Sequence, residues 1–161
     1  QSLEAKVNTN LLFPLLLIGV VVLLYFGYVY YSRTKVEITK NISPIKTKTG
    51  NFALRVKLNV KSKGKSENVS IIDSIPRMFK VYKKFEILKP TKINVADRRI
   101  HWDIGNMRRG EVRVFSYIIY STIGVVGKFN LPEAIVVYES KGQLSESYSN
   151  KVVFESSVKK K

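Results

Sequence analysis

The sequence predicts an all-β domain, an antiparallel β-sandwich of about seven or eight strands, preceded by one transmembrane α-helix. Residues 11–31 contain no charged side chain and form one apolar run. Beyond residue 35, apolar residues instead recur at every second position in short segments, which is the period of strands with one buried face. Between residues 32 and 158 we find no amphipathic helix of useful length, so the strands lack helical crossovers and are expected to pair antiparallel.

These patterns divide the chain into four parts. Residues 1–10 are an N-terminal tail, residues 11–31 the membrane helix, residues 32–155 the sandwich, and residues 156–161 a basic C-terminal tail. A chain of 161 residues has room for one domain of ordinary size together with an anchor.

The N-terminal run predicts a single-pass protein of the cell membrane. The stretch LLFPLLLIGVVVLLYFGYVYY matches a bilayer core, which needs roughly 20 apolar residues of helix. Pro14 falls in the first turn, where its missing N–H is tolerated, and Tyr28, Tyr30 and Tyr31 are typical of the headgroup region. Arg33 and the lysines after it favour a cytoplasmic domain by the positive-inside rule, so the orientation stays open.

The period-two pattern is clearest in residues 52–60, where Phe, Leu and Val alternate with Ala, Arg, Lys and Asn. The other predicted strands are rich in Val, Ile, Tyr and Phe and are bounded by Gly, Pro, Asn or Ser. They cover residues 36–39, 69–75, 85–88, 99–104, 112–120, 135–138 and 151–154. Trp102 has Ile100 and Ile104 at period two and is predicted to lie at the centre of the core.

Three motifs resemble a known family. Residues 68–76 read NVSIIDSIP, residues 100–111 read IHWDIGNMRRGE, and residues 148–152 read YSNKV. In this order and spacing they resemble the conserved repeat domain of archaeal and bacterial cell-surface proteins, which is related to S-layer-associated domains. The resemblance covers residues 35–155 and implies an immunoglobulin-like β-sandwich, a structural role and a location outside the cell.

The sequence offers no catalytic constellation. It has no cysteine, which excludes disulfides, thiolate metal sites and cysteine nucleophiles. Its one histidine, His101, precedes Trp102 and has Asp97 and Asp103 as nearby carboxylates. We interpret His101 as a solvent-facing strand residue, and therefore predict a protein that is not an enzyme and binds neither metal nor cofactor.

The net charge of +16 predicts attraction to anionic partners. The basic residues form four clusters, which are Lys61, Lys63 and Lys65; Lys80, Lys83 and Lys84; Arg98 and Arg99; and Arg108 and Arg109. On the loops of a tethered sandwich they are candidate contacts for anionic lipid or glycan. Nucleic acid is a rival partner, since Tyr82, Phe85 and His101 could stack on bases beside these charges. The remaining alternative is a solvated lysine-rich face without a partner.

Two tripeptides, Asn41-Ile-Ser and Asn68-Val-Ser, match the N-glycosylation pattern, so Asn41 and Asn68 are candidate acceptors if the domain faces outward.

The favoured function is a non-catalytic, membrane-anchored binding or scaffolding protein, either of the cell surface or envelope or as an accessory subunit of a membrane assembly. Its expected partners are the lipid bilayer and other membrane or envelope proteins. The alternative is a basic cytoplasmic module that docks on ribosomes, RNA or anionic inner-leaflet lipid.

Overall fold

The computed structural model describes residues 9–31, 34–46, 52–82, 85, 88–123 and 127–156. The chain divides into two compact units, Gln1–Arg33 and Thr34–Lys161. The first contains the helix α1 and the second contains all of the strands. The predicted C-terminal tail lies outside the described residues except for Ser156.

The helix α1 runs from Thr9 to Tyr31. Among the residues that the structure describes, no helix combines the length and the apolarity needed to cross a membrane. The finding contradicts the predicted transmembrane helix at residues 11–31 and the predicted single-pass placement in the cell membrane, and both are withdrawn.

The second unit is all-β, as predicted. Its strands are β1 (Val36–Lys46), β2 (Phe52–Ser62), β3 (Ser66–Ser74), β4 (Lys80–Tyr82), β5 (Lys92–Asn94), β6 (Arg99–Met107), β7 (Val112–Ser121), β8 (Gly127–Leu131), β9 (Ile135–Ser140), β10 (Gln143–Tyr148) and β11 (Val152–Ser156). The prediction of about seven or eight strands is too low, because the sequence pattern does not predict β4, β5, β8 or β10. The described residues of the predicted strand 85–88, Phe85 and Leu88, are not in strand conformation.

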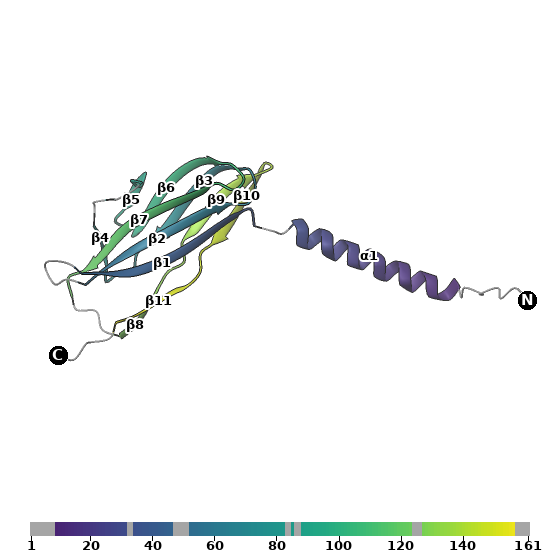
Figure 1. The fold of residues 1–161 in the computed structure, drawn as a ribbon, viewed down its shortest axis with the longest axis horizontal. Helices are drawn as coiled ribbons and strands as arrows, with labels where there is room; N and C mark the ends of the chain where they lie inside the picture. The colour runs from purple at the N-terminus through teal and green to yellow at the C-terminus, as the bar shows by residue number, and fades with distance from the viewer. Residues whose placement is uncertain are drawn as a thin grey trace, which may run out of the picture. The chain divides into compact units, whose positions relative to one another are not determined.

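The strands form two long sheets and one short one, and every pair is antiparallel. The four-stranded sheet has the order β1-β2-β7-β4, and the five-stranded sheet has the order β10-β9-β3-β6-β5. Figure 1 shows the two long sheets lying against each other as a sandwich, with β8 and β11 at one end.

The core lies between the two long sheets. Trp102 of β6 is only 2% exposed and contacts Phe115 and Tyr117 of β7, with ring centroids 5.7 Å apart in both pairs. These contacts join the five-stranded sheet to the four-stranded one, so the predicted central position of Trp102 is confirmed. A second group of rings, Phe52, Phe79, Phe129 and Phe154, packs β8 and β11 onto the sandwich.

Candidate functional site

The outer face of the four-stranded sheet gathers positive charge. Side chains alternate between the two faces of a strand, and in β2 the residues Leu54, Val56 and Leu58 point into the core. Lys57 and Lys61 therefore point outward and are exposed, and Arg55 lies half-buried on the same side. We call this surface, together with the neighbouring residues of β4 and β7, the basic face.

Pairing with β7 and β4 completes the basic face. Lys80 of β4 lies opposite Tyr120, Tyr82 lies opposite Ile118, and Ile118 in turn lies opposite Arg55. Lys80 is exposed, and 49% of Tyr82 is exposed. Lysine, arginine and tyrosine from three strands thus share one surface, which suits contact with an anionic and partly flat partner.

Few acids oppose this charge. Glu37 is the one carboxylate among the described residues of the four strands, and it lies at the edge of the sheet opposite Lys61. Its Oε2 accepts a hydrogen bond from Lys63 at 2.9 Å. That bond and the charge of Lys63 lower the pKa of Glu37. Among the described residues, none forms a hydrogen bond or ion pair with the ammonium groups of Lys57, Lys61 or Lys80, so these charges are available to a partner.

The predicted basic residues do not form one site. Lys61 and Lys80 belong to the basic face, whereas Arg99 begins β6 on the other long sheet. Lys63 and Lys65 lie in the turn between β2 and β3 and form ion pairs with Glu37 and Glu67. Arg108 and Arg109 are exposed in the turn between β6 and β7. Lys83 and Lys84 lie outside the described residues.

Arg98 acts within the fold rather than on its surface. Its backbone has a positive φ of 55°, and its guanidinium donates hydrogen bonds to the carbonyl oxygens of Ile75, Pro76 and Phe79 at 3.2, 2.7 and 2.5 Å. A guanidinium has a fixed fork of donors that suits several acceptors at once. These bonds tie the turn after β3 to the turn before β6, which leaves Arg98 little freedom to bind a partner.

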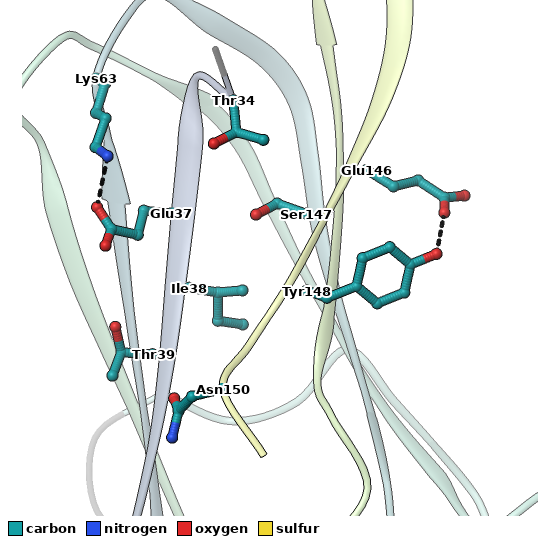
Figure 2. A pocket seen from close by; sticks show the side chains of 9 residues that line it. All are labelled: Thr34, Glu37, Ile38, Thr39, Lys63, Glu146, Ser147, Tyr148 and Asn150. Carbon is teal, nitrogen blue, oxygen red and sulfur yellow. Dashed lines mark hydrogen bonds and ion pairs between the residues drawn. The ribbon is translucent and has the colours of Figure 1, made fainter. Parts of the chain in front are cut away.

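A groove of about 490 Å³ runs between β1 and β10. Figure 2 shows Ile38 and Ser147 on the facing sides of the two strands, while Glu146 and Tyr148 point away from β1. Asn150 closes one end, because its side chain bonds both the backbone N–H and the carbonyl oxygen of Lys40, at 2.8 and 3.0 Å. The groove is therefore an internally bonded seam, and its edge at Lys40 is unavailable for strand addition.

A buried ion pair connects the two long sheets. Lys40 Nζ of β1 donates to Asp73 Oδ1 of β3 at 2.6 Å and to the carbonyl oxygen of Pro132 at 2.9 Å. Tyr117 of β7 donates to Asp73 Oδ2 at 2.6 Å. Burial raises the pKa of Asp73, against the opposing effects of Lys40 and Tyr117, and burial together with Asp73 raises the pKa of Tyr117 well above its usual range. Both acceptor oxygens have donors, so the arrangement is that of a satisfied structural network.

The two predicted glycosylation acceptors both lie in strands. Asn41 is exposed in β1 opposite Lys57. Asn68 has a positive φ of 50° at an irregularity in β3, and its Nδ2 donates to Glu139 at 3.0 Å. That hydrogen bond engages the nitrogen that a glycan would need, which makes Asn41 the more accessible acceptor.

The three side chains proposed for base stacking are also separated. Tyr82 belongs to the basic face, Phe85 packs against the core, and His101 lies half-buried opposite Ile72 on the other sheet. Within the described part of the chain, no three His, Cys, Asp or Glu side chains come together as metal ligands.

Sequence reasoning overlooked Arg55, Lys57 and Tyr120 as site residues. The signal was present in the alternation of β2 and β7, which places their side chains on the wet face. The sequence does not reveal that β2, β7 and β4 are neighbours in one sheet. In particular, β4 is only three residues long, too short for a period-two pattern to predict it.

Comparison with known proteins identifies no family for this chain. No known protein family and no curated protein sequence matches it. Among solved structures, it is similar to a GH20 exo-β-N-acetylglucosaminidase from Vibrio harveyi in complex with N-acetylglucosamine, at 10% identity and a TM-score of 0.48. An inactive mutant of that enzyme gives 10% identity and a TM-score of 0.49. Each match covers 73% of this chain but only 18% of the enzyme, and a likeness of this degree assigns no activity. The resemblance to cell-surface repeat domains therefore stays a prediction.

Proposed function

We propose that this chain is a non-catalytic binding or scaffolding module, an immunoglobulin-like sandwich whose basic face docks on an anionic partner. The observation that carries the proposal is the collection of Lys57, Lys61 and Lys80 on one sheet face, with Glu37 as the one described carboxylate of those strands. These lysines present positive charge along one face with few carboxylates to balance it, and such a surface attracts an anionic partner.

The strand order supports an immunoglobulin-like topology. Without the short strands β4 and β5 and the separate pair β8–β11, seven long strands remain in chain order: β1, β2, β3, β6, β7, β9 and β10. The first, second and fifth of these form one sheet, and the seventh, sixth, third and fourth form the other. This arrangement matches sandwiches of the fibronectin type III kind, which share the immunoglobulin architecture.

The test measures binding of the full chain to fluorescein-labelled poly-L-glutamate at increasing salt. We expect affinity to fall as salt rises, because exposed charges are screened. The variant Lys57→Gln/Lys61→Gln/Lys80→Gln should bind at least about tenfold more weakly, which corresponds to about 1.4 kcal/mol.

The matched control is Lys89→Gln/Lys92→Gln/Arg99→Gln, which removes equal charge from exposed positions in or beside the other long sheet. It should lose less affinity than the variant of the basic face. Equal losses in the two variants would mean that only the net charge matters and would refute a defined site.

A second candidate function is binding of single-stranded nucleic acid. It is favoured by Tyr82, which is 49% exposed beside Lys80 on the basic face, because bases stack on exposed aromatic rings next to cationic groups. Replacement of Tyr82 by Ala should then weaken binding of a mixed-sequence RNA oligonucleotide by about 1–3 kcal/mol without changing binding of poly-L-glutamate. Equal effects on both polymers would argue against stacking.

A further inference from the structure

The outer face of the five-stranded sheet carries acids along one part of its length, whereas Lys92 of β5 and Arg99 of β6 lie on the same face toward its other end. Strand pairing aligns Glu146 of β10, Val137 of β9, Ser70 of β3 and Asp103 of β6 in one row. Glu146 and Asp103 are exposed at the two ends of this row. Glu139 lies on the same side of the sheet, two positions from Val137 along β9. We call the part of the surface that carries Glu139, Glu146 and Asp103 the acidic face.

Apolar side chains accompany the acids. In the acidic face, Leu144 is 73% exposed and Tyr148 is 55% exposed, and Tyr148 lies opposite Ile135, which lies opposite Ile72. The basic face has a counterpart in the exposed Tyr82 and the half-buried Ile118. An interface commonly combines such apolar contacts with charged groups around them.

The spacing of the charges on the two faces also agrees. Lys57 and Lys61 are four positions apart on β2, which corresponds to about 14 Å along a strand. Glu146 and Asp103 are separated by three strand spacings, which corresponds to about 14 Å across a sheet. When the sheets of two copies pack with their strands crossed near 90°, Lys57 and Lys61 of one copy lie over Glu146 and Asp103 of the other.

We propose that the anionic partner of the basic face is the acidic face of a second copy of this chain. The proposal rests on the proposed function, since it names the partner of the same surface. The two faces are the outer sides of the two layers of one sandwich, so the contact is head to tail. Each added copy leaves one free basic face and one free acidic face, which produces an open series rather than a closed dimer. The net charge of +16 opposes this association, so we expect it to be weak and to depend on protein concentration.

Sedimentation velocity of the full chain tests the proposal with one variant for each face. Lys57→Gln/Lys61→Gln removes the lysine pair of the basic face and keeps the acidic face, and Glu146→Gln/Asp103→Asn removes the acidic pair and keeps the basic face. These side chains are exposed or half-buried, and circular dichroism checks that both variants are folded. The wild type should show a series of species that grows with concentration, whereas each variant alone should associate at least tenfold more weakly.

The decisive measurement is an equimolar mixture of the two variants. One variant retains the acidic face and the other retains the basic face, so the mixture should form a one-to-one dimer and nothing larger. Association of both variants that matches the wild type would overturn the proposal, as would a mixture that behaves like its separate components. If the wild type binds poly-L-glutamate through the basic face but does not self-associate, this inference fails and the proposed function stands. If poly-L-glutamate does not bind either, both fail.

Discussion

At the scale of single residues, the most consequential feature is the ion pair of Lys40 and Asp73, whose side chains are both 0% exposed. Transfer of two charges out of water is costly, and their attraction offsets that cost only when the remaining hydrogen-bonding capacity is used. The carbonyl oxygen of Pro132 and the hydroxyl of Tyr117 supply the additional partners. The pair therefore fixes how the two sheets align, because any other alignment of the sheets would bury one of these charges without its partner.

Replacement of Asp73 by Ala should destabilise the fold strongly. The change leaves the ammonium of Lys40 buried without a carboxylate, and we expect a loss of about 3–5 kcal/mol in the free energy of unfolding. Urea denaturation of the full chain measures this loss. The double replacement Lys40→Met/Asp73→Leu removes both charges and should recover most of it. A loss below about 1 kcal/mol for the single variant would show that water reaches Lys40.

The same carboxyl makes stability depend on pH. Because burial raises the pKa of Asp73, the folded state binds the proton more tightly than the unfolded state, where the pKa is about 3.9. The contribution of Asp73 to stability is therefore greatest below that value and declines as pH rises through the folded-state pKa. The difference in unfolding free energy between the wild type and Asp73→Asn should shrink from pH 4 toward pH 7. A difference that grows over this range would mean that Lys40 outweighs burial.

At the scale of elements, the strands that the sequence revealed are those with one clearly apolar face. In β2, Leu54, Val56, Leu58 and Val60 point inward, so period-two alternation identifies the strand. In β10 the buried residue is Ser147, whereas Leu144 and Tyr148 point outward and are exposed, so the pattern is inverted. The predicted strand 36–39 is shorter than β1, which continues to Lys46. The apolar pattern stops at residue 39 because the next inward position of β1 holds a charged residue, Lys40.

The link after β10 holds β1 in place through Asn150. Replacement of Asn150 by Ala removes both bonds to the backbone of Lys40, and we expect a loss of about 1–3 kcal/mol because a part-buried N–H loses its acceptor. Hydrogen exchange at the amide of Lys40 should accelerate together with the loss of stability. Asn59→Ala, on the outer face of β2, is the matched control and should change neither quantity substantially. An unchanged exchange rate in Asn150→Ala would show that the seam is held by other contacts.

At the scale of the whole molecule, charge and burial are organised by the same two sheets. The sandwich gathers lysines on the outer face of one sheet, places a row of acids on part of the other outer face, and buries a compensated ion pair in its interior. Composition predicted the net positive charge, but it could not predict this division, because the division follows from which strands are neighbours. The exposed sheet faces, rather than the loops, thus became the candidate site.

Trp102 reports on whether the sandwich unfolds as one unit. It is the single tryptophan of the chain and contacts Phe115 and Tyr117 across the two sheets, so its emission should shift to longer wavelength when the sheets separate. If the sheets form one cooperative unit, this shift and the loss of the β-sheet infrared band should have the same urea midpoint. The control Trp102→Phe/Leu144→Trp carries its tryptophan at an exposed position and should show little shift. An emission change at clearly lower urea than the infrared change would mean that the sheets part before their strands unpair.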